Sequence, residues 1–337
     1  MTDVSVDGPR VIGTGLVALD LVVGLDPDST VQAWAGGTCG NVMSMLAWHG
    51  WDAYPVARLN GDPASERVKA DLDRWGVHLD LASCTPSAST PIVVQEMRQT
   101  RHGETTHKFS WSCLQCGGWL PSFKPITQAV VEQVEPFLAG SSVFFFDRVS
   151  RGTLDIAKLA ATAGAVVMFE PSGRGDDRMF REALELSHIV KYADQRMSEL
   201  ADSLPSSSRI LEVQTLGAQG LRFRAPRRMR SDSWKTLRAV PAAAVADSCG
   251  SGDWCTSGLL NQLAADGVNG LEEAKVSEIA AGLHYGQELA AWNCQFEGAR
   301  GGMYFESQEE NRSKDLIPVS DIRSGATPLV ACPKCAA

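Results

Sequence analysis

The sequence predicts a doubly wound α/β fold, in which helices flank a mainly parallel β-sheet and a small β-sheet forms a lid. Two observations lead to this prediction. Short apolar runs, typical of strands buried on both faces, alternate along the chain with helical patterns. One polar hairpin interrupts that alternation and suits a sheet with one solvated face. With 337 residues, 44% of them hydrophobic, the chain can bury a large core.

The expected elements follow one another in the order that a parallel sheet requires. A turn at Gly36-Gly37 precedes the first helix, and Gly50 and Gly76 end the first two helices. In chain order we expect strands at 11–15 and 19–23, a helix at 40–49, a strand at 53–57, a helix at 64–75, a hairpin at 91–98 and 106–112, a helix at 127–139, a strand at 142–146, a helix at 153–163, strands at 166–169, 210–215 and 221–224, and helices at 253–265 and 276–293.

The hairpin turns at His102-Gly103 and is interpreted as part of the lid. We expect the lid to be built from about residues 16–35 and 90–115. Because the chain has no low-complexity linker, residues 1–325 are predicted to form one domain, followed by a short C-terminal tail at 326–337.

The charge distribution argues against a nucleic-acid partner. The formal net charge of -9 is spread along the chain, whereas binding to a phosphate backbone needs clustered Lys and Arg. The one basic cluster, five arginines between Arg222 and Arg230, is interpreted as a solvated hairpin, although it could also contact polyanions. No apolar run approaches the roughly 20 residues that span a bilayer, so no membrane partner is expected.

The amino-terminal segment, Met1 to Arg10, carries two acidic residues and lacks the layout of a signal peptide. The nine cysteines are an odd number in a large chain, and in a reducing compartment they should be thiols or metal ligands. We therefore expect a cytoplasmic protein.

The strongest chemical signal is the segment 247–253, which reads Asp-Ser-Cys-Gly-Ser-Gly-Asp and runs directly into a helical pattern. Gly250 and Gly252 allow the backbone to approach a ligand closely, and the free amides around Ser251 at the helix start attract an anion. A carboxylate beside a bound phosphate is repelled, so Asp253 needs another task. Accepting a proton from an attacking hydroxyl is one, and a simple capping charge is the other.

This segment resembles the D-T-x-G-A-G-D signature of the ribokinase-like (PfkB) carbohydrate kinases, with Ser248 and Ser251 in place of Thr and Ala. Other resemblances follow in the family's order over about 290 residues. They are Gly13 to Asp20, like its first strand ending on a substrate-binding Asp; Gly36-Gly37-Thr38-Cys39-Gly40-Asn41, like its G-G-x-x-x-N; Asn60-Gly61-Asp62, like its G-x-D; Phe169-Glu170-Pro171-Ser172, at its F-D-P-N; Thr215-Leu216-Gly217-Ala218-Gln219-Gly220, like its T-x-G-x-x-G; and Gly298-Ala299-Arg300, like its closing G-A.

The resemblance implies transfer of the γ-phosphate of ATP, with Mg²⁺, to a hydroxyl of a small molecule. It implies that Asp253 is the catalytic base and that Gly250, Ser251 and Gly252 hold the transferring phosphoryl group. The other implied contacts are Asp20, Gly36, Gly37 and Asn41 with the acceptor, and Thr215, Gly217, Gly220, Asp247 and Arg196 with the nucleotide.

One motif of the family is absent. The N-x-x-E that organises magnesium and phosphate through water is replaced by Ala193-Asp194-Gln195-Arg196, so that Arg196 inverts the local charge. Asp194 or Glu199 could take over by a small shift, or Arg196 could contact a nucleotide phosphate directly. We expect kinase activity to be retained.

The identity of the acceptor stays open at this stage. A sugar or sugar-like molecule is the first prediction. A nucleoside kinase is the alternative, because Trp34, Phe109 and Trp111 could supply an aromatic wall. A nucleotide or sugar sensor that has lost turnover is a further alternative, which the missing motif allows. Because lids of this family often pair, the resemblance also suggests a homodimer through the lid.

Two Cys-x-x-C pairs are not explained by the resemblance. Cys113 and Cys116 end the lid hairpin, and Cys332 and Cys335 lie near the C-terminus, 215 residues further on. Two such pairs are the usual halves of a Cys₄ zinc site, and Gly117-Gly118 resembles a zinc-knuckle turn. We predict structural Zn²⁺ here, with two unrelated thiol pairs or a redox pair as alternatives.

Overall fold

The computed structural model describes residues 8–26, 31–99, 101, 105–197, 210–229, 233–305, 332 and 335. The elements in these ranges are, in chain order, β1 (Arg10–Thr14), β2 (Ala18–Val23), β3 (Gln32–Gly36), α1 (Thr38–Trp48), β4 (Asp52–Leu59), α2 (Pro63–Arg74), β5 (Ala82–Cys84), β6 (Ile92–Gln99), β7 (Thr105–Ser110), α3 (Gln128–Val134), η1 (Glu135–Phe137), β8 (Val143–Phe146), α4 (Arg151–Thr162), β9 (Val166–Phe169), α5 (Asp177–Leu186), β10 (Ile189–Ala193), β11 (Leu211–Thr215), η3 (Gly217–Gln219), β12 (Leu221–Arg224), β13 (Lys235–Leu237), α6 (Ser251–Leu263), α7 (Gly267–Glu273) and α8 (Val276–Asn293).

The strands form one large and one small sheet. The large sheet has the order β13-β12-β11-β10-β9-β8-β1-β4-β5, and it is parallel from β11 to β5 with β12 and β13 added antiparallel. The predicted fold class is therefore confirmed. Among the described residues, none of the helices combines the length and the apolar character needed to cross a membrane.

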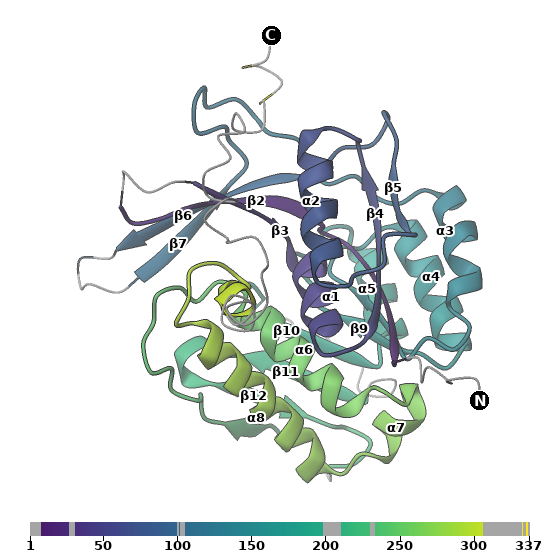
Figure 1. Cartoon of the computed structure of the whole chain (residues 1–337). Helices are drawn as coiled ribbons and strands as arrows, with labels where there is room; N and C mark the ends of the chain where they lie inside the picture. Colours follow the sequence, from purple (N-terminus) through teal and green to yellow (C-terminus); the bar gives the residue numbers. More distant parts are fainter. Residues whose placement is uncertain are drawn as a thin grey trace, which may run out of the picture.

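Alternate residues of the central strands enter two separate apolar clusters on the two faces of the sheet. In β8, Val143 and Phe145 belong to one cluster, and Phe144 and Phe146 belong to the other. Helices α1, α6 and α8 contribute to the first cluster, whereas α3, α4 and α5 contribute to the second. Figure 1 shows α3 and α4 on the side of the sheet away from α6 and α8. Burial on both faces explains why these strands are continuously apolar.

The small sheet has the order β3-β2-β6-β7, and its strands lie in or beside the two segments expected for the lid. Strand β2 pairs parallel with β6 and antiparallel with β3, and β6 forms a hairpin with β7. In Figure 1 this sheet extends to one side of α1 and α2. The expected hairpin turn at His102-Gly103 lies outside the described residues, as does the tail apart from Cys332 and Cys335.

The strands expected at 11–15 and 19–23 are found as β1 and β2, and the stretch from Gly13 to Asp20, likened above to one strand of the family, spans parts of both. Strand β1 ends at Thr14, and Asp20 lies in the middle of β2, in the lid. The backbone changes direction at Gly15, whose φ of +142° is unfavourable for other residues. A Cβ on Gly15 would lie 1.6 Å from Asp147 Oδ1, and the Leu16 amide donates to this carboxylate oxygen at 2.9 Å.

Two arginines of the basic cluster, Arg222 and Arg224, lie on β12 in the antiparallel part of the large sheet. Arg227 and Arg228 follow the strand, and Arg230 lies outside the described residues. Arg222 donates to Gln214 Oε1 at 2.5 Å, and Arg224 pairs with Glu212 at 2.8 Å, so both cations bond to the neighbouring strand β11. Both guanidinium groups also lie over the ring of Trp234.

Candidate active site

Helix α6 begins at the glycine-rich turn that the sequence singled out. Its N-cap residue Gly250 has a left-handed conformation (φ +75°), and a Cβ there would lie 2.5 Å from the carbonyl oxygen of Ala299. Only glycine fits this position without strain. At Gly252 a Cβ would have ordinary contacts, 3.6 Å from Glu170 Oε1 and 3.7 Å from Lys191 Nζ. Thus the first turn of α6 lies beside a buried ion pair.

Asp253 is buried in this first turn, with 9% of its surface exposed. The side-chain amide of Asn41, on α1, donates to Asp253 Oδ2 at 2.8 Å. Burial is the main cause that raises the pKa of Asp253 to about 7, and the nearby Glu170 carboxylate also raises it. The Asn41 bond and the charges of Lys191 and Arg196 oppose this rise. The carboxyl group is therefore tuned to exchange a proton near neutral pH.

The ion pair beside Asp253 joins three elements and was not predicted from the sequence. Glu170, directly after β9, accepts hydrogen bonds from Lys191 on β10 and, at 2.5 Å, from Thr256 Oγ1 on α6. The side chain of Lys191 is 2% exposed. Burial opposes its charge, but the Glu170 carboxylate raises the pKa of Lys191 overall. A buried cation thus lies next to the anion-attracting helix start. The available signal was a single lysine in the otherwise apolar strand 189–193.

A solvent-open hollow of about 280 Å³ lies between the lid and this helix start. It is lined by Asp20 and Trp34 of the lid, by Asn41, and by the segment from Glu297 to Tyr304. Burial is the main cause that raises the pKa of Asp20 to about 7, while the Gly37 amide and the Arg300 charge lower it.

The two glycines predicted to meet the acceptor lie against the Asp20 carboxylate. The Gly37 amide donates to Asp20 Oδ2 at 3.3 Å, and a Cβ on Gly36 would lie 1.9 Å from the same oxygen. Gly36 therefore leaves room for this side chain, whereas at Gly37 a Cβ would lie 2.4 Å from the carbonyl oxygen of Leu16.

Three buried polar atoms around this hollow have no hydrogen-bond partner among the described residues: Asp20 Oδ1, Asn41 Oδ1 and Arg300 Nη1. Buried polar atoms are nearly always bonded in folded proteins, so this set indicates a place for a polar ligand. Two acceptors and one donor match a molecule with several hydroxyl groups.

Aromatic rings form one wall of the hollow. The rings of Trp34 and Tyr304 lie with their centroids 4.2 Å apart. Of the three aromatic residues predicted for a nucleoside wall, Trp34 lines the hollow, whereas Phe109 and Trp111 do not. Tyr304 was missed in the sequence, and it also donates to Asp71, which pairs with Arg300 at 2.8 Å.

Asp247, predicted at the nucleotide site, bonds the helix start to the lid. It accepts hydrogen bonds from Gln95 on β6 at 2.9 Å, from the Gly298 amide at 3.0 Å and from the Cys249 amide at 2.9 Å. His107 Nδ1, on β7, lies 3.7 Å from its other oxygen. These contacts hold both lid strands over the turn before α6.

The residues predicted for the nucleotide lie at the carboxyl end of the parallel strands. Thr215 ends β11, and the turn from Gly217 to Gly220 leads into the antiparallel β12. Arg196 follows the neighbouring strand β10, and it is close enough to Asp253 for its charge to lower that pKa. A Cβ on Gly220 would lie 2.2 Å from the carbonyl oxygen of Leu237, so this turn requires glycine.

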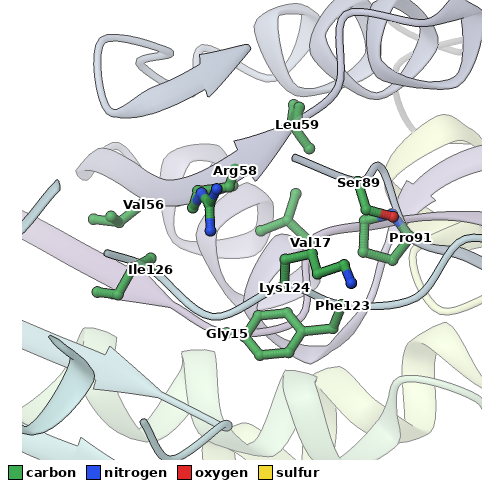
Figure 2. Close-up of a pocket in the computed structure, with 11 residues that line it drawn as sticks. Gly15, Val17, Val56, Arg58, Leu59, Ser89, Pro91, Phe123, Lys124 and Ile126 are labelled. Carbon is green, nitrogen blue, oxygen red and sulfur yellow. The ribbon is translucent and has the colours of Figure 1, made fainter. Parts of the chain in front are cut away.

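A second hollow of about 240 Å³ contains none of the predicted site residues. Figure 2 shows that it is lined by Gly15, Arg58, Phe123 and Lys124, among others. Arg58 is held by the carbonyl oxygen of Pro125 at 2.9 Å. Neither hollow includes Asp253 or the turn before it, but the first includes Asn41, which bonds to Asp253.

A buried carboxyl group beside an anion-attracting helix start and a polar hollow is an arrangement suited to phosphoryl transfer to an alcohol. The model of the pfkB family carbohydrate kinases matches residues 17–304, and the chain belongs to this family. Membership implies ATP-dependent phosphorylation of a sugar-like substrate. A search of curated proteins gave no match.

Solved structures with the same fold include two sugar kinases and a nucleoside kinase. A ribokinase from Arabidopsis thaliana, complexed with ribose and ATP, is 18% identical (TM-score 0.63; 87% of this chain, 94% of that one). A fructokinase from Xylella fastidiosa with bound ATP is 17% identical (TM-score 0.69; 90% and 99%). A nucleoside kinase from Burkholderia thailandensis, in complex with inosine, is 18% identical (TM-score 0.60; 90% and 96%). At these identities the likeness concerns the fold.

Proposed function

We propose that this protein transfers the γ-phosphate of ATP to a hydroxyl of a sugar or sugar-like molecule, with Asp253 as general base. The observation that carries the proposal is the position of Asp253. Its carboxyl group has a pKa of about 7 and is hydrogen-bonded to Asn41, which also lines the polar hollow. A base that titrates near the working pH is the most effective one, and a well-placed base contributes about 10² to 10⁴ in rate.

The reaction moves one proton and exchanges one bond at phosphorus. The acceptor hydroxyl gives its proton to Asp253 while its oxygen bonds to the γ-phosphorus. The bond from that phosphorus to the bridging oxygen of ATP breaks, and ADP leaves. Asp253 later releases its proton to solvent. Asn41 stabilises the ionised carboxylate before the transfer, since its bond favours the charged form.

The transferring phosphoryl group would lie against the amides from Gly250 to Gly252. Two features support this placement: the start of α6, which has no side-chain cap at Gly250, and the buried Lys191 near Gly252. The Ser251 amide donates to the carbonyl oxygen of Ser248 at 3.3 Å. The rest of ATP would extend along the turn from Thr215 to Gly220, with Arg196 near its phosphates. The bond of Asp247 to Gln95 indicates that its part is to hold the lid over the nucleotide.

Mg²⁺ would enter bound to the phosphates of ATP, where it neutralises developing charge. Glu170, whose carboxylate lies near Gly252, is already engaged by Lys191 and Thr256. We therefore assign no direct protein ligand to the metal. Positive charge from Lys191 and Arg196 compensates in part for the missing N-x-x-E motif.

The chemistry of the hollow favours a sugar as the acceptor. The unpartnered atoms of Asp20, Asn41 and Arg300 suit several hydroxyl groups. A nucleoside kinase is the second candidate, because the aromatic pair Trp34–Tyr304 could pack against a base.

A screen of sugars and nucleosides tests the proposal. Thermal shifts would be measured with ATP and Mg²⁺, and ADP release would be measured for each compound that raises the melting temperature. A sugar that both stabilises the protein and stimulates ADP release is the expected result. A nucleoside hit would favour the second candidate. Stabilisation with no ADP release for any compound would identify a sensor and overturn the proposed activity.

Two further expectations concern assembly and location. A homodimer through the lid is supported by the exposed rings of Trp111 and Trp119, which are 41% and 75% exposed at the end of the lid. Light scattering on the purified protein, with Trp119→Ser as the variant, tests it; a monomer at every concentration contradicts it. The cytoplasmic location remains a prediction from the nine cysteines.

A further inference from the structure

The two Cys-x-x-C pairs, far apart in the sequence, meet in the structure. Cys113 and Cys116 follow the lid strand β7, and Cys332 and Cys335 belong to the C-terminal tail. Cys113 Sγ lies 3.9 Å from Cys335 Sγ, and Cys116 Sγ lies 3.6 Å from Cys332 Sγ. All four sulfur atoms lie within 4.8 Å of one another. Nothing in the phosphoryl-transfer site requires this arrangement.

These distances match metal coordination and not disulfide bonding. A disulfide joins its sulfur atoms at about 2.05 Å. In a tetrahedral thiolate site with Zn–S bonds of about 2.3 Å, the sulfur atoms are about 3.8 Å apart. The two contacts between the pairs lie close to that value, and a small contraction brings all four atoms to one centre.

The backbone around the first pair forms a closed loop. Ser112 and Trp119 form an antiparallel bridge, and the Cys113 amide donates to the carbonyl oxygen of Gly118 at 2.8 Å. The Gln115 amide donates to Cys113 Sγ at 3.4 Å, a contact that stabilises a thiolate. Gly117 has a left-handed conformation (φ +67°) in the position of a knuckle turn.

The second pair presents its sulfur atoms from a matching turn, in which the Cys335 amide donates to the carbonyl oxygen of Cys332 at 2.8 Å. Cys332 is 2% exposed and belongs to the apolar cluster that also contains Leu120, whereas Cys116 and Cys335 are exposed. A tail residue buried in the core at this point indicates that the tail is held here.

We propose that Cys113, Cys116, Cys332 and Cys335 bind one structural Zn²⁺. Each thiol loses its proton to the solvent as its sulfur bonds to the metal, so loading releases protons. Four protein ligands leave no open position for water or substrate, which is typical of a structural site.

The expected effect is to fasten the C-terminal tail to the connection that leads from the lid back to the main domain. In that connection the Leu120 amide donates to the carbonyl oxygen of Trp111. The carbonyl oxygen of Pro121 accepts a hydrogen bond from the amide of Ile92, at the start of β6. The site therefore links the tail to the base of the lid, away from Asp253.

The test is metal analysis of the full chain, expressed and purified without a metal-binding tag or chelator. We expect about one zinc per chain in the wild type and below about 0.2 in Cys335→Ser, because loss of one of four thiolates weakens the site severely. Cys332→Ser should behave alike. Cys84→Ser, which removes an exposed thiol outside the cluster, is the matched control and should keep its zinc.

Two further measurements separate zinc binding from a folding defect. Cobalt(II) added to the metal-depleted wild type should give the absorption bands of a tetrahedral tetrathiolate site, and Cys335→Ser should lack them although its far-UV circular dichroism is unchanged. The melting temperature should fall on zinc removal in the wild type and in Cys84→Ser. Iron in place of zinc, disulfide-linked peptides in mass spectrometry, or four freely titrating thiols in metal-free protein would each overturn the proposal.

Discussion

Replacing Asp253 by Asn should separate catalysis from stability. The change keeps the shape of the side chain, and the amide oxygen can still accept the hydrogen bond from Asn41. It removes the base while leaving the helix-start amides in place. Turnover should therefore fall by about 10² or more, whereas ATP affinity should stay within about threefold.

The same substitution should stabilise the fold at alkaline pH. Burial raises the pKa of Asp253 from 3.8 to about 7, and a difference of about three units corresponds to about 4 kcal/mol. Below pH 4 the Asp253 carboxyl group is protonated in both the folded and the unfolded chain, so it does not lower the free energy of unfolding. Between pH 4 and pH 7 the unfolded chain loses this proton while the folded chain keeps it, so stability falls as the pH rises. Above pH 7 the whole cost is present.

For a chain of this length, about 4 kcal/mol corresponds to a rise in melting temperature of about 5 °C. We expect that rise for Asp253→Asn at pH 8 and a rise of about 2 °C at pH 5. Differential scanning calorimetry at both pH values, with ADP release measured in parallel, checks it. Asp80→Asn changes an exposed aspartate and should alter neither quantity. Turnover within threefold of the wild type would remove Asp253 from the mechanism. An unchanged melting temperature at pH 8 would refute the claim that burial of the ionised Asp253 carboxylate destabilises the fold.

The remaining predictions concern the groups around this carboxylate. Turnover should rise with pH through about 7 as Asp253 ionises. Lys191→Met should shift this rise to higher pH, because the lysine charge lowers the pKa of Asp253; an unshifted pH profile would contradict the assignment of Asp253 as the base. Ala193→Asn combined with Arg196→Glu should also shift the pH profile to higher pH, because the Arg196 charge lowers the pKa of Asp253. The double variant should also make turnover respond to phosphate and Mg²⁺; no response to either would contradict the interpretation of this segment as a replaced N-x-x-E motif. Asp20→Asn should raise the KM of the acceptor about 10-fold to 100-fold and leave that of ATP unchanged, since it weakens a charged hydrogen bond in the hollow; equal effects on both substrates would contradict its role.

The fold could be predicted because the amino-acid composition of its strands indicates whether one or both faces are buried. The runs 143–146 and 166–169 are apolar throughout, and they form β8 and β9, buried on both faces. The two strands expected at 11–15 and 19–23 form β1 and β2, and they are separated at Gly15, whose backbone conformation directs the chain from the large sheet into the lid.

The candidate site could be predicted only where a motif is contiguous. The turn from Gly250 to Asp253 is one such motif. The ion pair of Glu170 and Lys191 is not, because it depends on the parallel pairing of β9 with β10, which fixes two residues 21 positions apart. Arg300 was noted only as part of a closing motif, and its pairing with Asp71 joins segments 229 residues apart. Such pairs are set by topology, and a single sequence contains no direct record of them.

The two ends of the segment 247–253 bond to different parts of the acceptor site. Asp247 accepts from Gln95 of the lid, and Asp253 accepts from Asn41 of α1. Because only six positions separate the two carboxylates, a shift of the lid strand is transmitted to the turn that carries the helix-start amides. A lid that is held in this way places the base and the amides before the substrates arrive, and such preorganisation is where charge stabilisation is most effective. Breaking the lid bond with Gln95→Leu should therefore lower kcat while Asp253 itself is unchanged, and an unaltered kcat would show that the lid and the helix start act independently.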